Sequence, residues 1–228
     1  MIFKIMLRGF IFDLDGVITD TANLHYLAWK KELGKYQIDY SAEENELLKG
    51  LSRQDTLKKI LKLKNISNQF TEKEINQICD NKNNQYKQML KTQLNSTFIL
   101  PGIENLLKKL KKFKIKIALA SSSHNAKLIL KKLDLFKYFD FIVNPKNVKN
   151  GKPAPDIFLT AIKGINLEPK ECIAIEDAPS GIEAINKAGI FSIAISSQKN
   201  KNSFLNANLI INLASEINLK ELKKIFNN

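Results

Sequence analysis

The 228-residue chain contains few cysteines and few arginines, and it has no long apolar run. Cys79 and Cys172 lie far apart without a CxxC pair, which excludes a disulfide scaffold and a zinc finger and favours free thiols in a reducing compartment. No apolar run approaches the ~20 residues that span a bilayer. Residues 1–10, interrupted by Lys4 and Arg8, lack the apolar region of a signal peptide. We therefore expect a cytoplasmic protein with no membrane partner.

Positive charge is abundant, although arginine is scarce. The chain has 36 Lys+Arg against 23 Asp+Glu, for a formal net charge of +13, and only Arg8 and Arg53 are arginines. Proteins that read nucleic acid use arginine for its planar fork and cluster basic residues on one element. Here the lysines are spread, and the densest run, residues 108–116, alternates with apolar residues as a solvated helix face does. Lysine, asparagine and isoleucine share A/T-rich codons, so we attribute the charge to codon bias and expect no nucleic-acid partner.

Short apolar runs predict buried strands. They cover residues 9–12, 115–120, 141–143, 172–175 and 191–195, and residues 209–211 are a candidate for a further strand. Such continuous runs are typical of parallel strands that are covered on both faces. Amphipathic helices are predicted between the strands, at residues 102–112, 125–133, 155–163 and 180–188. This alternation favours an α/β fold with a doubly wound, Rossmann-like parallel sheet.

The alternation of strands and helices is interrupted after the first predicted strand. The interval contains no convincing strand, and its pattern predicts helices over residues 22–33, 43–48, 53–62 and 72–94. Ser41 with Glu44, and Thr71 with Glu74, fit the capping box that starts a helix. We therefore expect an all-helical cap domain inserted into an α/β catalytic core. The expected cap covers residues 21–96, and the expected core covers residues 1–20 and 97–228.

Polar residues follow four of the predicted strands. They are Asp13 and Asp15 after the first strand, residues 121–123 after the second, Lys152 some way beyond the third, and Glu176 and Asp177 after the fourth. Ligands of open α/β sheets bind beyond the carboxyl ends of the strands, so we expect these residues to share one crevice. Four carboxylates would repel one another without a cation. Oxygen ligands without nearby His or Cys favour a hard ion, and Mg²⁺ is the usual one for phosphate chemistry.

The Asp13-Leu14-Asp15 sequence is the most specific chemical motif in the chain. Residues two apart on an extended chain point to the same side, so both carboxylates face one ligand. One carboxylate can attack phosphorus and form an aspartyl-phosphate, while the other exchanges the proton of a hydroxyl. Gly16 lets the backbone approach a phosphate closely. The alternative is an ordinary Asp and Gly turn that closes a strand.

The other strand-end residues also have ordinary structural explanations. Residues 121–123 precede a helix, where hydroxyl and amide groups suit a phosphate but also serve as a helix cap. Lys152 can neutralise phosphoryl oxygens or be one of many surface lysines. Glu176 and Asp177 can be acids that cap a helix. Their joint placement at successive strand ends favours the phosphate site.

These motifs resemble a known superfamily in their order and in their placement. Phe12-Asp13-Leu14-Asp15-Gly16-Val17, Ser121, Lys152-Pro153 and Glu176-Asp177 are similar to the four motifs of the haloacid dehalogenase-like phosphotransferases. Within that superfamily the chain resembles the β-phosphoglucomutase family, on residues 13–21 with His25 and Trp29 and on residues 48–53, 117–121 and 151–156. That resemblance implies interconversion of β-glucose 1-phosphate and glucose 6-phosphate, through an aspartyl-phosphate and a bound β-glucose 1,6-bisphosphate.

The resemblance also implies a role for each matching position. Asp13 is the expected nucleophile and Asp15 the expected general acid/base. Mg²⁺ is expected on Asp13, the Asp15 carbonyl, Glu176 and Asp177. The expected phosphate-binding residues are Ser121 and Lys152 for the transferred group and Arg53 for the distal phosphate. The expected sugar-side and cap residues are His25, Trp29, Gly50, Ser52, Lys82, Ser123 and Asn125, with His25 and Lys82 placing Asp15 as the cap closes.

The chain departs from the family at His124, where the family usually has a lysine. A neutral imidazole carries no charge, so we expect a weaker, pH-dependent contact at this position. In the cap, His25 and Trp29 can instead be packing residues, and Arg53 can be a surface residue at a helix start.

Three alternative functions stay open on the sequence alone. One is an Mg-dependent phosphatase of small sugar phosphates or phosphoglycolate that uses the same Asp nucleophile. Another is a mutase for a different sugar phosphate, and the third is a non-catalytic basic binding module. The intact acidic cluster argues against the last. We expect a monomeric enzyme whose partner is a small sugar phosphate.

Overall fold

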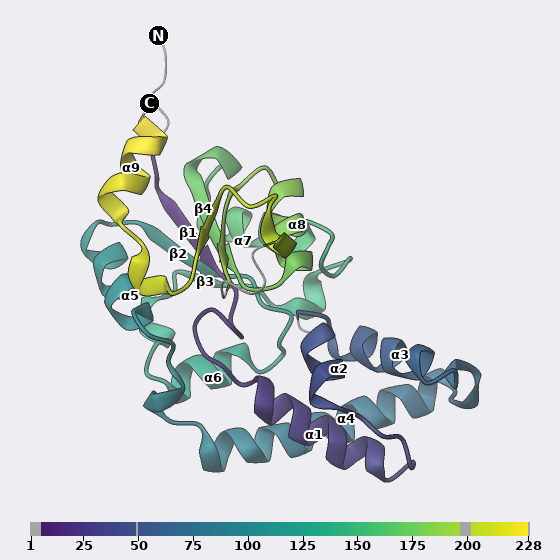
Figure 1. Ribbon diagram of the computed structural model, residues 1–228. Coiled ribbons are helices and arrows are strands. Elements are labelled where there is room, and N and C mark those ends of the chain that lie inside the picture. The colour runs from purple at the N-terminus through teal and green to yellow at the C-terminus, as the bar shows by residue number, and fades with distance from the viewer. Residues whose placement is uncertain (1–5, 49, 197–201, 228) are drawn as a thin grey trace.

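A six-stranded sheet forms the centre of the fold in the computed structural model, which describes residues 6–48, 50–196 and 202–227 (Figure 1). Its strands are β1 (Gly9–Phe12), β2 (Lys116–Leu119), β3 (Phe141–Ile142), β4 (Cys172–Glu176), β5 (Phe191–Ile195) and β6 (Leu209–Ile211). The strand order is β3-β2-β1-β4-β5-β6, and every neighbouring pair is parallel. This confirms the predicted doubly wound sheet. Residues 1–5, 49, 197–201 and 228 of the expected domains lie outside the described residues.

Helices cover both faces of the sheet (Figure 1). One face carries α5 (Ile103–Lys112), α6 (Ala126–Lys132) and α9 (Leu219–Asn227), and the other carries α7 (Asp156–Ile165) and α8 (Pro179–Lys187). Side chains alternate across β1, since Phe10 and Phe12 join the first apolar cluster while Ile11 joins the second. Because an apolar layer covers each face of the sheet, the strands are continuous runs of apolar residues.

Four α-helices lie between β1 and α5, and the described residues of this interval contain no strand of the sheet. They are α1 (Ala22–Gly34), α2 (Ala42–Leu47), α3 (Arg53–Leu63) and α4 (Glu72–Gln93), and we call them the helical segment. The segment has its own apolar cluster, which includes Trp29, Leu33, Tyr40, Leu57 and Ile78. The two predicted capping boxes, at the starts of α2 and α4, are both present.

Two neighbouring stretches of chain connect the helical segment to the α/β part. The Thr19 hydroxyl donates to the Phe98 carbonyl over 2.8 Å, and the Leu100 amide donates to the Ile18 carbonyl over 2.9 Å. Figure 1 shows the segment beyond the ends of the strands that lead into it. The order of elements therefore places the helical segment over the carboxyl edge of the sheet.

The structure adds elements that the sequence analysis did not predict. Helix α9 was missed, although Leu219, Leu222 and Phe226 recur at helical spacing and pack against the first apolar cluster. Several short 3-10 helices, such as Ser96–Phe98 and Pro145–Asn147, also form in the connections. Among the described helices, none is both long enough and apolar enough to cross a membrane.

Candidate active site

A buried lysine joins two carboxylates at the carboxyl edge of the sheet. Asp13 follows β1, and Glu176 ends β4, the strand next to it. The Lys152 ammonium donates to Asp13 Oδ1 over 2.6 Å and to Glu176 Oε1 over 2.5 Å. All three residues are at most 6% exposed. Parallel pairing of β1 with β4 therefore brings together side chains that are far apart in the chain.

Glu176 fixes the position of Lys152. Its second oxygen, Oε2, accepts hydrogen bonds from the amides of Asp177 and Ala178, over 2.6 and 2.7 Å, at the start of α8. A Cβ atom on Gly181 would overlap the Glu176 carboxylate, so the glycine leaves the space that the carboxylate fills. Both oxygens of Glu176 are thus engaged, and its role as a metal ligand stays a prediction.

The protonation of Asp13 depends on its burial and its neighbours. Burial raises the pKa of Asp13 to about 7, and the charge of Glu176 adds to that rise, while Lys152 opposes it. The neighbouring carboxylates raise the pKa of Lys152, although burial acts in the other direction. With both carboxylates ionised, the single ammonium leaves one negative charge in excess. A second cation beside Asp13 would therefore stabilise its ionised, nucleophilic form.

The residues on this edge fit a magnesium ion. Asp13 and Asp177 line the same pocket, together with Asp15 and Gly16. The described residues contain no ready cluster of three His, Cys, Asp or Glu side chains around a metal position. Mg²⁺, however, is commonly held by one or two carboxylates, with waters and substrate phosphate oxygens completing its shell. Two carboxylates with oxygen-only donors therefore match this ion.

Asp15 lies in a different environment from Asp13. The Thr21 hydroxyl donates to Asp15 Oδ1. The Thr21 oxygen also lies 2.7 Å from the Tyr86 hydroxyl of α4, which must be the donor because Thr21 has a single hydroxyl hydrogen. Burial raises the pKa of Asp15, and the Thr21 hydrogen bond opposes the rise. A carboxyl group that holds its proton more readily is suited to donating that proton to a leaving oxygen.

Ser121 begins a loop that leads into α6. Its hydroxyl oxygen accepts from the Ser123 amide over 3.1 Å, and the Ser123 hydroxyl oxygen accepts from the Asn125 amide over 3.3 Å. Each hydroxyl keeps its own hydrogen for donation to a ligand. The Asn125 side-chain amide donates to Asn83 Oδ1 of α4 over 2.8 Å. The loop therefore offers hydroxyl donors to the pocket and contacts the helical segment.

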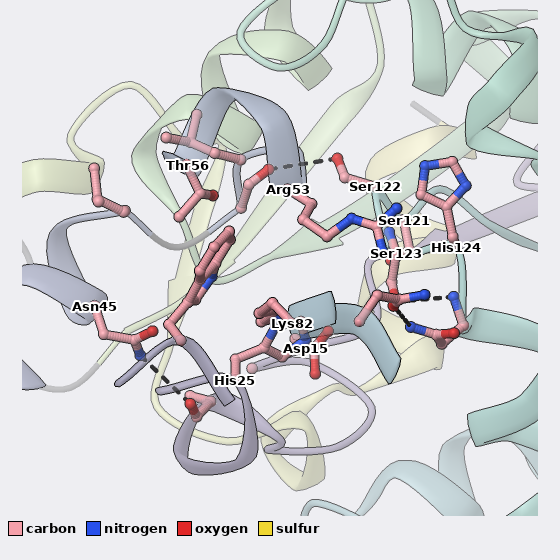
Figure 2. A pocket seen from close by; sticks show the side chains of 18 of the residues that line it. Asp15, His25, Asn45, Arg53, Thr56, Lys82, Ser121, Ser122, Ser123 and His124 are labelled. Carbon is pink, nitrogen blue, oxygen red and sulfur yellow. Dashed lines mark hydrogen bonds between the residues drawn. The ribbon is translucent and has the colours of Figure 1, made fainter. Parts of the chain in front are cut away.

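Arg53 presents unpaired donors in this pocket. It is the first residue of α3, and Figure 2 shows its side chain extending toward the loop of Ser121 and Ser123. Nε and Nη1 are buried and have no hydrogen-bond partner among the described residues. Nη2 lies 3.7 Å from Asp80 Oδ1, a long ion pair. Because buried guanidinium N–H groups are normally satisfied, this arrangement is suited to an anionic ligand.

Lys82 and His25 form a buried pair on α4 and α1. Lys82 is 2% exposed, and its ammonium lies 2.7 Å from His25 Nδ1. It also lies 5.1 Å from the centre of the Trp29 ring and 4.9 Å from that of Tyr86. Burial, followed by the charge of Arg53, lowers the pKa of Lys82 to about 7. Burial likewise keeps the pKa of His25 well below its usual value, so Nδ1 accepts from Lys82.

The pocket gathers most of the residues singled out from the sequence (Figure 2). It is lined by Asp13, Asp15, His25, Trp29, Gly50, Arg53, Lys82, Ser121, Ser123, Asn125 and Asp177, together with His124. Lys152 reaches Asp13 from an adjoining cleft, which Ser52 also lines. The Ser52 hydroxyl is engaged by Asp55, since it donates to Oδ2 over 2.5 Å and accepts from the amide. Ser52 therefore caps α3 in this structure.

Sequence reasoning did not select several residues that contact the site. Thr21 and Tyr86 hold Asp15, and Asn83 contacts Asn125. Tyr86 lies four residues after Lys82 on α4, on the same helix face, so helical spacing was an available signal. The contact of Tyr86 with Thr21 spans 65 residues of sequence and depends on how α1 and α4 pack.

Comparison with known proteins places the chain in a family. A profile of the family described as "Haloacid dehalogenase-like hydrolase" matches residues 10–195, well over half of the chain. The chain belongs to the haloacid dehalogenase-like hydrolase family. This confirms the superfamily that the four strand-end motifs indicated.

Within the haloacid dehalogenase-like hydrolases, similar proteins include mutases and phosphatases. A "Beta-phosphoglucomutase" of Bacillus subtilis is 43% identical, over 95% of this chain and 94% of its own length. A crystal structure titled as β-phosphoglucomutase from Clostridium difficile has a TM-score of 0.91 and 43% identity, over 97% of this chain and 98% of that one. A "Phosphorylated carbohydrates phosphatase" of Thermotoga maritima is 30% identical, over 96% of this chain and all of its own.

Proposed function

We propose that the chain is a β-phosphoglucomutase, which interconverts β-glucose 1-phosphate and glucose 6-phosphate. The observation that carries this proposal is the presence of two separate cation positions around one pocket. Lys152 lies beside Asp13, and Arg53 turns two unpaired N–H groups toward the pocket from α3. A reaction through a sugar bisphosphate needs two phosphate positions, whereas hydrolysis of a monoester needs one. The similarity to mutases over nearly the whole chain supports the same function.

Asp13 is the proposed nucleophile. One carboxylate oxygen forms a bond to phosphorus, and the bond between phosphorus and the leaving oxygen breaks, which gives an aspartyl-phosphate. The Lys152 ammonium and the Ser121 hydroxyl neutralise and orient the phosphoryl oxygens during transfer. The next sugar hydroxyl then attacks this phosphorus and releases Asp13. Over two such transfers β-glucose 1,6-bisphosphate is the intermediate, and the phosphoryl group moves between the two ends of the sugar.

Asp15 is the proposed general acid/base. It gives its proton to the oxygen that leaves and accepts the proton of the sugar hydroxyl that attacks. Thr21 holds one of its carboxylate oxygens, and Tyr86 holds Thr21. The helical segment supplies Tyr86, so the position of Asp15 depends on how that segment packs. This couples proton transfer to the arrangement of the two parts of the chain.

Asp13, Asp177 and the main-chain carbonyl of Asp15 are the proposed ligands of Mg²⁺. When bound, the ion would neutralise the phosphoryl oxygens and lower the repulsion between them and Asp13. Glu176 contributes to the same charge balance by holding Lys152. Asp177 lies against Gly16, which has a φ of +80° and leaves no room for a side chain beside the carboxylate.

The helical segment is the proposed cap over a core of residues 1–20 and 97–228. The Ser122 hydroxyl donates to the Gly50 carbonyl over 3.4 Å, and Asn125 contacts Asn83, so both contacts join the core to the segment. With the segment closed, a sugar hydroxyl rather than water meets the aspartyl-phosphate. The balance between mutase and phosphatase activity therefore depends on closure.

A single coupled assay tests the proposal. The protein is incubated with Mg²⁺, β-glucose 1-phosphate and a trace of glucose 1,6-bisphosphate, and both glucose 6-phosphate and free phosphate are followed. We expect rapid formation of glucose 6-phosphate with little free phosphate. Free phosphate without glucose 6-phosphate would instead support the second candidate, a sugar-phosphate phosphatase, which the Thermotoga relative favours.

Arg53 separates these two candidates further. In Arg53→Lys the point charge stays, but the planar fork for a second phosphate is lost. For a mutase we expect the KM for β-glucose 1-phosphate to rise about tenfold or more, because the loss of one or two hydrogen bonds to a charged group weakens binding by about that factor. Hydrolysis of p-nitrophenyl phosphate, which has no second phosphate, serves as the control and should change little. Equal losses on both substrates would contradict the distal-phosphate role.

A further inference from the structure

A second cavity adjoins the active-site pocket on its outer side. It is about 1170 Å³ in volume and lies between α3 and the chain of residues 145–153 that leads to α7. We call it the basic cleft. Leu51, Arg53, Ser122 and His124 line both this cleft and the active-site pocket, so these four residues form the partition between them. The two cavities are therefore neighbours that share one wall.

The basic cleft carries charge of one sign. Its lining includes seven basic side chains, Arg53, Lys58, Lys59, Lys62, Lys146, Lys149 and Lys152. Its only acidic side chain is Asp55, which already accepts the Ser52 hydroxyl. A concave surface with charge of one sign concentrates the electric field and raises the local concentration of oppositely charged ligands.

Most of the outer lysines have no ion-pair partner in the part of the chain that the structure describes. Lys58 pairs with Glu72 over 2.7 Å, and Lys152 pairs with the buried carboxylates. Lys59, Lys62, Lys146 and Lys149 are exposed, and none of them forms an ion pair with another described residue. These four ammonium groups are thus available to a ligand anion.

The charges continue inward from the mouth of the cleft. The outer lysines lead to Arg53 and Lys152, the two cations to which the proposed mechanism assigns the distal and the transferred phosphate. A sugar bisphosphate carries two phosphates, and a monophosphate carries one. The attraction of the cleft therefore acts about twice as strongly on the bisphosphate as on either substrate.

We propose that the basic cleft is a capture site for sugar bisphosphates, which binds the intermediate outside the partition and delivers it to the active site. This inference rests on the proposed mutase function. The intermediate has to be turned end for end between the two transfers. Lysines that hold the bisphosphate next to the pocket shorten the time before it binds the active site again, because a charged cleft raises association rates by about 10 to 10³-fold. Added salt screens this effect when the charges are exposed.

The overall charge of +13 attracts anions everywhere, so the test needs a matched control. Lys59 and Lys62 are exposed, three residues apart on α3, and both line the cleft. Lys109 and Lys112 are also exposed and three residues apart, but they lie on α5, and they line neither cavity. The double variants K59E/K62E and K109E/K112E therefore change the net charge by the same amount at different places.

Association of glucose 1,6-bisphosphate is measured by stopped-flow fluorescence in an Asp13→Asn background, where phosphoryl transfer does not interfere. Trp29 is the single tryptophan of the chain and lines the active-site pocket, so it reports arrival of the ligand. For K59E/K62E we expect the association rate constant to fall about tenfold at low salt. The neutral variant K59Q/K62Q should give an intermediate value, and K109E/K112E should change it less than twofold. The loss should be smaller for β-glucose 1-phosphate and should shrink as salt is added.

Equal rates in K59E/K62E and K109E/K112E would overturn the proposal, as would a loss that salt does not reduce. The measurement does not depend on turnover. If the association rate falls only in the cleft variant, but the protein with Asp13 intact makes no glucose 6-phosphate in the coupled assay, the capture site is supported and the mutase function is rejected. Normal mutase activity with unchanged association rates would reject the capture site alone.

Discussion

At the scale of single residues, the central feature is a buried ammonium that two carboxylates share. Lys152 lies between Asp13 and Glu176, and all three are nearly inaccessible to solvent. Removal of one partner from a buried ion pair leaves an uncompensated charge, which destabilises a protein more than loss of a surface pair does. Asp13 is the most informative of the three to change, because Lys152 keeps Glu176 as a partner when Asp13 becomes neutral.

Asp13→Asn tests the nucleophile. The amide cannot form an acyl-phosphate, so we expect turnover to fall by at least about a thousandfold. Formation of glucose 6-phosphate measures the loss, and thermal unfolding checks that the fold survives. Asp134→Asn is the matched control, since Asp134 is exposed, pairs with Lys137 alone among the described residues and has a positive φ that asparagine tolerates. Full activity in Asp13→Asn would remove Asp13 from this role.

We expect His124 to make binding of the distal phosphate depend on pH. Burial lowers the pKa of His124, and Arg53, Lys146 and Lys87 lower it further, so the imidazole of the free protein is neutral at pH 7. A phosphate bound beside Arg53 would raise that pKa again, and binding would then take up a proton. The KM for β-glucose 1-phosphate should therefore rise as pH increases from 6 to 8, by up to about tenfold for each unit of pKa change on binding.

His124→Lys is the comparison for this effect. The lysine stays charged across the same pH range, so we expect a flatter KM profile than in the unaltered protein. The titration of the substrate itself is common to both and cancels in the ratio of their KM values. A ratio that does not vary with pH would show that His124 does not contact the phosphate.

The residues of the site differ in how far the sequence could predict them. Asp13 and Asp15 are neighbours in the chain and follow a clear strand, so a local pattern was enough. Thr21 and Tyr86, which hold Asp15, meet only because α1 and α4 pack together. Their contact depends on tertiary geometry that no local pattern contains.

At the scale of elements, α4 supplies three contacts to the site. Lys82, Asn83 and Tyr86 lie within two turns of the helix and contact His25, Asn125 and Thr21, respectively. The helix is 22 residues long and starts with a complete capping box. A change at the start of α4, far from these residues, should therefore affect stability rather than chemistry.

Thr71→Ala tests this expectation. The Thr71 hydroxyl accepts from the Glu74 amide over 3.3 Å and donates to the Glu74 carboxylate. Loss of such a cap costs about 1 kcal/mol, which corresponds to a fall in Tm of roughly 2 to 4 °C for a chain of this size. Thr92→Ala, at the other end of α4, removes a hydroxyl that only donates to helix carbonyls and should lower the Tm little or not at all. Similar losses in both variants would contradict the capping argument.

The elements themselves were mostly predictable. Buried parallel strands read as apolar runs because both of their faces are covered, so β1 to β5 were found, and the candidate strand at 209–211 is β6. The short helix α9 was not predicted, because its helical spacing of apolar residues extends over only nine residues, fewer than the window that such a pattern needs. The pairing of β1 with β4 across more than 150 residues was not predicted, because neither strand alone indicates its neighbour in the sheet. The sequence indicated only that both strands belong to one doubly wound sheet.

At the scale of the whole molecule, the helical segment and the α/β part meet through apolar packing and a few side-chain hydrogen bonds. Leu24 of α1 and Tyr86 and Leu90 of α4 belong to the first apolar cluster, which also packs on the sheet. Besides Asn83 with Asn125 and Ser122 with Gly50, the Lys132 ammonium donates to the Lys91 carbonyl over 2.6 Å. Gly50, with a φ of +79°, lies against α8, where an added Cβ would be 3.3 Å from Ala178 Cβ. We expect this interface to open for substrate and close again, with the fit at Gly50 helping to exclude water.

Gly50→Val tests whether closure determines the fate of the phosphoryl group. The larger side chain would press on Ala178 and Ser180 and would also strain a backbone conformation that glycine tolerates. Since the core residues around Asp13 are untouched, we expect the aspartyl-phosphate still to form, while water reaches it more often. The ratio of free phosphate to glucose 6-phosphate should therefore rise several-fold in the coupled assay. Gly34→Val is the control, because Gly34 is exposed at the end of α1 and a Cβ there meets no atom within 4 Å. If the ratio rose equally in both variants, or in neither, closure at Gly50 would not be what protects the phosphoryl group from water.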